Sequence, residues 1–120
     1  MLPSELVKVR QEEYLDRHVT EQLKSFMKEG YGGVVELFLT QSEMHLAQLI
    51  KSVDIDKAEC RLEAHSLKGS AANIGARRLS MLAEQVEKSL KSDDGAITRQ
   101  LIDDAVSELD VVAPMLRCHS

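Results

Sequence analysis

The chain has 120 residues, of which 43% are hydrophobic and only 3% aromatic, and this predicts one domain with an aliphatic core. Its formal net charge of -5 argues against a general nucleic-acid-binding protein. Two cysteines are too few for a disulfide framework, no apolar run reaches transmembrane length, and the N-terminus has no signal-peptide character. We therefore expect a cytoplasmic protein.

Helical periodicity begins near the N-terminus, where residues 4–29 form the first predicted helical segment. Ser4 can serve as its N-cap, and an apolar stripe repeats at helical spacing further along. The stripe consists of Leu15, Val19, Leu23, Phe26 and Met27. The glycine-rich cluster at residues 30–33 then predicts a loop.

Four longer amphipathic helices are predicted at about residues 34–52, 56–74, 77–91 and 96–116. In the first of these, the inward positions are Val35, Phe38, Leu39, Leu46, Leu49 and Ile50. Strict alternation of apolar and polar residues never persists, so no strand is predicted. Because only a few residues connect successive helices, sequence neighbours should pack antiparallel. The sequence predicts an all-α, antiparallel up-down four-helix bundle with an additional N-terminal helix, as a single domain over residues 1–120.

Polar and glycine residues mark the ends of these helices. Asp54 or Asp56 can cap the helix at 56–74, and Gly75 is a C-terminal glycine signal. The turn at residues 92–95 offers an N-cap for the last helix. Pro114 falls near the end of that helix, where it is expected to disturb the final turn.

The helix at 56–74 buries one arc and exposes a histidine. The buried arc consists of Cys60, Ala64, Leu67, Ala71 and Ile74. His65 points away from it, and its neighbours on the outer face are Arg61, Lys68, Gly69 and Ala72. Glycine inside a helix costs about 1 kcal/mol relative to alanine, so Gly69 indicates that bulk is kept away from the imidazole. An exposed histidine with little bulk and a lysine nearby is suited to meeting a phosphate on another protein.

The surroundings of His65 are basic although the protein is acidic. Between residues 61 and 78 there are four basic side chains, Arg61, Lys68, Arg77 and Arg78, against one acid, Glu63. Such a patch suits a phosphate or an acidic partner. Leu62, on the same outer side, is either an incidental exposed leucine or part of an apolar docking surface. The other histidines, His18, His45 and His119, have no such surroundings and are interpreted as ordinary surface residues.

A carboxylate is expected beside His65. His65 lies ten residues before Gly75 and Glu87 lies twelve residues after it, so the two reach similar heights in an antiparallel hairpin. Gln85 is at a compatible height but points further out. A carboxylate that accepts from one ring nitrogen fixes the tautomer and leaves the other nitrogen as a nucleophile. The alternative is that Glu87 is an ordinary flanking glutamate.

Several other kinds of site are excluded. The glycine cluster at 30–33 lacks a preceding strand and the Gly-Lys-Ser/Thr ending of a phosphate-binding loop. No His-x-x-x-His or Cys-x-x-Cys pair offers metal ligands. A Ser-His-Asp hydrolase is not supported, because the sequence shows neither a sheet nor a nucleophile elbow.

Residues 64–76, which read AHSLKGSAANIGA, closely resemble the signature of histidine-containing phosphotransfer (HPt) domains. The resemblance extends from about residue 15 to residue 91, and beyond that the chain is similar only in being helical. It implies that His65 is the phosphorylated residue, that Lys68 neutralises the phosphate and that Gly69 allows close approach. Glu87 fits the position where the family often carries Gln or Glu to support the histidine.

The same resemblance implies partners and a mechanism. His65 accepts a phosphoryl group from the receiver domain of a hybrid sensor histidine kinase and passes it to the receiver of a response regulator. The expected partner-binding residues are Arg61, Leu62, Gly69 and Ala72. The chain needs no cofactor, since the receiver supplies Mg²⁺, and nothing resembles a kinase ATP site. We therefore expect a monomeric phosphoryl carrier rather than an enzyme, with no metal, nucleic-acid or membrane partner.

Two alternatives remain at this point. The chain could be the phosphoacceptor domain of a chemotaxis-type kinase, which a separate ATP-binding domain phosphorylates. It could also be a helical adaptor that kept the fold and lost the relay, although the intact motif argues against this.

Overall fold

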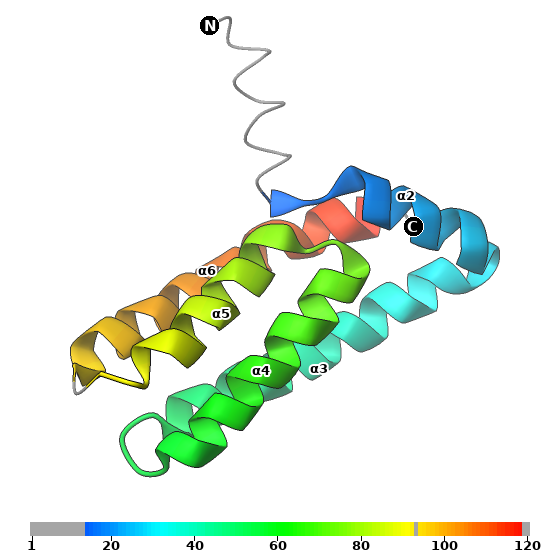
Figure 1. The fold of residues 1–120 in the computed structure, drawn as a ribbon. Helices are drawn as coiled ribbons and strands as arrows, with labels where there is room; N and C mark the ends of the chain where they lie inside the picture. Colours follow the sequence, from blue (N-terminus) through cyan, green and yellow to red (C-terminus); the bar gives the residue numbers. More distant parts are fainter. Residues whose placement is uncertain (1–13, 93, 119–120) are drawn as a thin grey trace, which may run out of the picture.

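The computed structural model describes residues 14–92 and 94–118, and these residues form helices without any strand. A short helix α2 (Arg17–Met27) and a 3-10 turn (Lys28–Gly30) precede α3 (Tyr31–Ser52). They are followed by α4 (Lys57–Ile74), α5 (Arg77–Ser89) and α6 (Gly95–Cys118) (Figure 1). The predicted all-α class is confirmed.

Helices α3 to α6 form a closed, antiparallel four-helix bundle. Each packs against its neighbour in sequence, and α6 returns to pack against α3. Helix α2 lies across the end of the bundle that carries the α4–α5 turn (Figure 1). The outer face formed by α4 and α5 is therefore supported by α3 and α6, which pack against the inner sides of these two helices.

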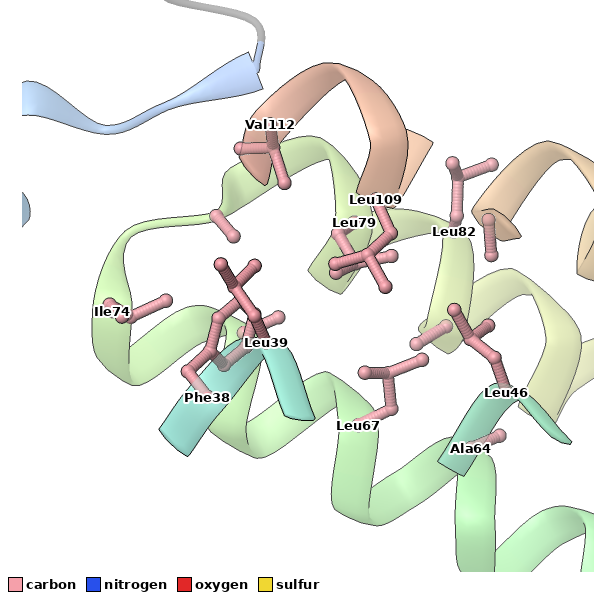
Figure 2. Packing of buried hydrophobic residues seen from close by; sticks show 14 of the residues in the cluster. Phe38, Leu39, Leu46, Ala64, Leu67, Ile74, Leu79, Leu82, Leu109 and Val112 are labelled. Atoms are coloured by element: carbon pink, nitrogen blue, oxygen red, sulfur yellow. The ribbon is translucent and has the colours of Figure 1, made fainter. Parts of the chain in front are cut away.

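The core is built from aliphatic side chains on the inner arcs of these four helices. Leu46 from α3, Leu67 from α4, Leu79 and Leu82 from α5, and Leu109 from α6 point into the same interior (Figure 2). The predicted inner arc of α4 is buried throughout: Cys60, Ala64, Leu67, Ala71 and Ile74 are at most 3% exposed. Burial of this arc fixes the rotation of α4 about its axis, so the opposite arc must face solvent.

Side-chain caps explain where the helices begin. Asp16 accepts hydrogen bonds from the backbone N–H groups of His18 and Val19 and so starts α2 at Arg17. Asp56, one of the two predicted candidates, accepts from the N–H of Glu59 and starts α4. Each cap satisfies N–H groups that a first helical turn leaves unpaired.

Gly75 ends α4 and joins it to α2. Its φ of 84° lies in the left-handed region, which favours glycine. Its carbonyl accepts a hydrogen bond of 2.7 Å from the N–H of Asp16. A Cβ at position 75 would lie 2.8 Å from the Asp16 carbonyl oxygen, so the close approach of the two segments also requires glycine.

Three sequence-based expectations about helix bounds are corrected. The loop predicted at residues 30–33 is wrong, because α3 already begins at Tyr31. Tyr31 is only 1% exposed, and its burial compensates for two glycines in the first turn. Helix α5 ends at Ser89, before the predicted residue 91, whereas α6 starts at Gly95 and continues through Pro114 to Cys118.

Two side chains predicted to face inward are exposed. Phe26 is 84% exposed because α2 meets the bundle through Thr20, Leu23 and Met27, which lie on another side of that helix. Ile50 is 56% exposed because it lies at the edge of the buried arc of α3. Of the predicted N-terminal segment at 4–29, residues 4–13 lie outside the described residues.

Among the described helices, none has a stretch that is both long and apolar enough to cross a membrane.

Candidate functional site

His65 lies in the middle of α4, on the outer face that α4 shares with α5. Its side chain is 69% exposed, whereas Ala64 and Leu67 on either side of it in the sequence are fully buried. These buried neighbours hold the helix in one rotation, so the imidazole projects into solvent. A reactive group of another molecule can therefore reach the ring without any rearrangement of the bundle.

Glu87 of α5 lies beside His65, at the height expected from the turn at Gly75. Its Oε1 atom is 3.4 Å from Nδ1 of His65, and its side chain is 26% exposed. This distance is longer than the 2.7–3.2 Å of a typical N–H···O hydrogen bond. The carboxylate thus faces Nδ1 without clamping it, and Nε2 is directed away from Glu87.

Lys68 is held by a residue that the sequence reasoning missed. Its Nζ lies 3.6 Å from Oε1 of Glu84, and Nζ of Lys88 lies at the same distance from that atom. The Ser80 hydroxyl also donates a hydrogen bond of 2.9 Å to the Lys68 carbonyl. The height argument used for Glu87 could have found Glu84, which lies nine residues after Gly75 while Lys68 lies seven before it.

Gly69 leaves open space one turn after His65. It has an ordinary helical conformation, and a Cβ built there would meet nothing within 4 Å. The fold therefore does not require a glycine at this position. Ala72, the next outward residue, is also exposed, so the surface around the imidazole has little bulk on this side.

Comparison with known proteins agrees with this arrangement. The family model for the Hpt domain matches residues 33–113, which include most of α3 and α6 and all of α4 and α5. This chain belongs to the Hpt domain family. No curated protein matches it in sequence.

Solved structures give the same family. Histidine-containing phosphotransfer protein B from Pseudomonas aeruginosa PAO1 is 27% identical, with a TM-score of 0.79 over 87% of this chain and 91% of that one. A rice protein described as a histidine-containing phosphotransfer protein is 17% identical, with a TM-score of 0.78 over 95% of this chain and 83% of that one. The second similarity shows the fold alone.

The remaining outward residues of this Hpt domain lie on both sides of His65. By helical geometry Arg61 and Lys68 lie on the α5 side of the histidine, whereas Leu62 and Gly69 lie on the opposite side. Leu62 is 61% exposed. The outer face of α4 is thus basic on the α5 side of His65 and uncharged at Leu62 and Gly69 on the opposite side.

A second histidine–carboxylate pair, which the sequence reasoning did not anticipate, links α3 to α4. Nδ1 of His45 lies 2.6 Å from Oε2 of Glu63, and the two side chains are only 26% and 21% exposed. The interpretation of His45 as an ordinary surface residue is therefore wrong. The contact also removes Glu63, the one acid of the predicted basic patch, from the face of His65.

Arg78 does not belong to the patch around His65. Its Nε lies 3.3 Å from Oε1 of Glu108 on α6, and its guanidinium lies 5.8 Å from the ring centroid of Tyr14. Glu108 is only 4% exposed, and this burial raises the pKa of its carboxyl to about 7, while the charge of Arg78 opposes the rise. The predicted basic patch is therefore smaller than the sequence suggested, with Arg78 turned to the α5–α6 side of the Hpt bundle.

Within the described part of the chain, no three His, Cys, Asp or Glu side chains of the Hpt domain gather in a way that could hold a metal ion.

Proposed function

We propose that His65 is the phosphoacceptor of a phosphorelay, which takes a phosphoryl group from the phospho-aspartate of one receiver domain and passes it to a second receiver. The observation that carries this proposal is the exposed imidazole of His65 on a face of low bulk, with the Glu87 carboxylate behind Nδ1. The family match to an Hpt domain supports it.

The chemistry follows from the two ring nitrogens. With the proton on Nδ1 facing Glu87, the lone pair of Nε2 is free to attack phosphorus in line. The N–P bond forms as the P–O bond to the receiver's aspartate breaks, and the electron pair of that bond leaves with the aspartate carboxylate. The phosphorylated ring then carries positive charge with N–H at Nδ1, and the nearby Glu87 carboxylate stabilises it. Transfer to the second receiver is the reverse of this step.

Lys68 has a supporting role in this proposal. Its ammonium group lies on the same helix face as His65 and shares Glu84 with Lys88. Charge spreads over the oxygens of a phosphoryl group in transit, so a nearby cation lowers the energy of transfer. Because the Glu84 carboxylate that holds Lys68 is exposed to solvent, Lys68 is able to turn toward the phosphoryl group at little cost.

The protein is in this proposal a carrier and not a kinase. It supplies a nucleophile and a docking face, while Mg²⁺ is expected in the acidic pocket of the receiver. The donor is the receiver of a hybrid sensor histidine kinase, the acceptor is a response regulator, and the carrier acts as a monomer in the cytoplasm.

The test is transfer from phosphorylated receiver domains to the wild type, His65→Gln and His45→Gln. We expect label on the wild type and on His45→Gln, and none on His65→Gln, because the imidazole of His65 is 69% exposed beside the open space at Gly69. Circular dichroism should show that all three fold. Label on His65→Gln at the wild-type level would refute the assignment.

A further inference from the structure

Two rows of side chains meet where the outer edges of α4 and α5 pack together (Figure 1). On α5, Ser80, Glu84 and Glu87 follow one another at steps of four and three residues, so they lie on one side of the helix. Each directly follows a buried residue of the core: Leu79, Ala83 and Val86. The opposite row on α4 contains His65 and Lys68. Ser80 and Glu84 contact Lys68, and Glu87 contacts His65.

Ser80 is the member of the α5 row that contacts the backbone of α4. Its partly buried hydroxyl donates a hydrogen bond of 2.9 Å to the carbonyl of Lys68. In a helix each carbonyl accepts from the N–H group four residues later, and its oxygen keeps a second lone pair for such a hydroxyl. A helix carbonyl cannot move without the helix itself. The hydrogen bond from Ser80 therefore fixes the position of α5 along α4.

The contacts of the two glutamates hold the helices less firmly. Glu84 lies 3.6 Å from the ammonium group at the end of the long Lys68 side chain, which can follow a movement of either helix. Glu87 lies 3.4 Å from Nδ1 of the exposed His65 ring. Exposed pairs at such distances contribute little free energy. The distance between Glu87 and His65 is therefore set by the packing of α4 against α5 and not by the attraction of the pair.

Ser80 is close enough to Glu87 for this packing to be transmitted along α5. The two residues are seven positions apart, which corresponds to about 10 Å or two turns of one continuous helix. A shift of α5 at Ser80 is thus carried to Glu87. Misplacement of a supporting group by about 1 Å is enough to slow a reaction measurably.

We propose that Ser80 is a positioning residue for phosphoryl transfer, because its hydrogen bond to the Lys68 carbonyl sets the height of α5 against α4 and thereby holds the Glu87 carboxylate beside Nδ1 of His65. Ser80 acts through Glu87 and does not touch the phosphoryl group. The inference rests on the proposed function and adds to it a residue on which the geometry of the site depends.

The experiment compares the wild type with Ser80→Ala, Glu87→Ala, the double variant of these two, and the control Ser89→Ala. The control removes another hydroxyl that crosses between helices, since Ser89 pairs with Thr98 of α6 at 2.7 Å. Alanine favours a helix, so both serine variants should fold. Three quantities are measured: transfer from a phosphorylated receiver, labelling by phosphoramidate, and the tautomer ratio of His65. Phosphoramidate is a small donor that needs no docking, and ¹⁵N NMR at about pH 8.5, where imidazoles are neutral, gives the tautomer ratio.

We expect Ser80→Ala to slow both reactions by about threefold, which is less than the effect of removing Glu87 itself. The double variant should be no slower than Glu87→Ala, because the serine acts through that carboxylate. In the wild type the carboxylate favours the proton on Nδ1 of His65. Ser80→Ala should shift the proton toward Nε2, and Ser89→Ala should change neither the rates nor the tautomer ratio.

The tautomer ratio does not depend on phosphoryl transfer, so the two proposals can fail separately. If neither donor labelled wild-type His65, the proposed function would be wrong. An unchanged tautomer ratio in Ser80→Ala would refute the positioning role, whether or not transfer occurred. If Ser80→Ala slowed transfer from the receiver but not labelling by phosphoramidate, Ser80 would be a contact of the receiver instead. Equal slowing in Ser89→Ala would assign the effect to a general loosening of the bundle and would also overturn the proposal.

Discussion

His45 and His65 each face a glutamate on a neighbouring helix, but the two pairs lie in different environments. His45 and Glu63 are in close contact at 2.6 Å and are about three-quarters buried between α3 and α4. His65 and Glu87 lie 3.4 Å apart, and the imidazole is 69% exposed on the α4–α5 face. The same two residue types thus form a structural link in one place and leave a ring available for chemistry in the other.

The difference follows from where each pair lies relative to the core. A charge-assisted hydrogen bond that is shielded from water is short and stabilises the helices it joins. An exposed pair gains little stability because water competes for both partners. Proximity of histidine and glutamate therefore does not by itself make a ring accessible, whereas the exposure of His65 leaves its ring within reach of a partner. Four predictions test this comparison.

The largest expected effect concerns a third glutamate, Glu108, which is more buried than either Glu63 or Glu87. Its pKa of about 7 lies above the value of 4.5 for an unperturbed glutamate. The folded state therefore binds the proton more tightly than the unfolded chain. The stability that this protonation contributes is complete below pH 4.5 and is lost as pH rises through about 7.

Glu108→Gln should remove this dependence, because the amide keeps the shape and carries no charge to desolvate. At about pH 8 the variant should be more stable than the wild type by about 3 kcal/mol, since each unit of pKa difference corresponds to about 1.4 kcal/mol. At about pH 4 the two should be nearly equal. Urea unfolding across this pH range measures the difference, and parallel curves for the two proteins would contradict the prediction.

The next effect tests access to the exposed ring. Gly69→Leu should slow transfer from a phosphorylated receiver by about tenfold or more, equivalent to about 1.4 kcal/mol, because the side chain occupies the space beside His65. Gly33 is a matched control. A Cβ at this position also meets nothing within 4 Å, but Gly33 lies on α3 and not beside His65 on α4. Gly33→Leu should transfer normally. Equal slowing in both variants would show that access is not what Gly69 provides.

A smaller effect is expected when the tight pair is broken. Glu63→Gln should lower the free energy of unfolding by about 1–2 kcal/mol, since the hydrogen bond to His45 involves a charged acceptor and is partly shielded. Transfer through His65 should not change. A double-mutant cycle with His45→Gln measures the coupling directly, and a coupling energy near zero would mean that the 2.6 Å contact adds nothing to stability.

The smallest effect is expected for the loose pair. Glu87→Ala should leave the free energy of unfolding within about 0.5 kcal/mol of the wild type, because the contact is long and exposed on one side. Transfer should slow by about fivefold, which corresponds to the loss of about 1 kcal/mol of electrostatic stabilisation of the positively charged phosphorylated ring. Gln85→Ala, at a similar height but exposed on α5, is the control and should have no effect. Equal rates for both variants would remove Glu87 from the site.

Sequence periodicity by itself determined the helices of the bundle and the inner arc of α4. Apolar spacing of three and four residues is a local property, and the five residues predicted on that arc are all buried. Because the opposite arc must then face solvent, the outward position of His65 followed from the same pattern. The contact of His65 with Glu87 could also be predicted from the sequence. In two antiparallel helices joined by a short turn, the distance of each residue from the turn follows from the helical rise per residue.

Only the tertiary structure decided which partners the charged side chains choose. The contacts of His45 with Glu63, Lys68 with Glu84, and Arg78 with Glu108 each join two helices. Their distances depend on how the helices are rotated and spaced. A sequence pattern does not specify the rotation and spacing precisely enough to predict which side chains come within hydrogen-bonding distance. A groove of about 280 Å³ that Arg61, Glu87 and Lys91 help to line appears for the same reason only when α4 and α5 are packed together.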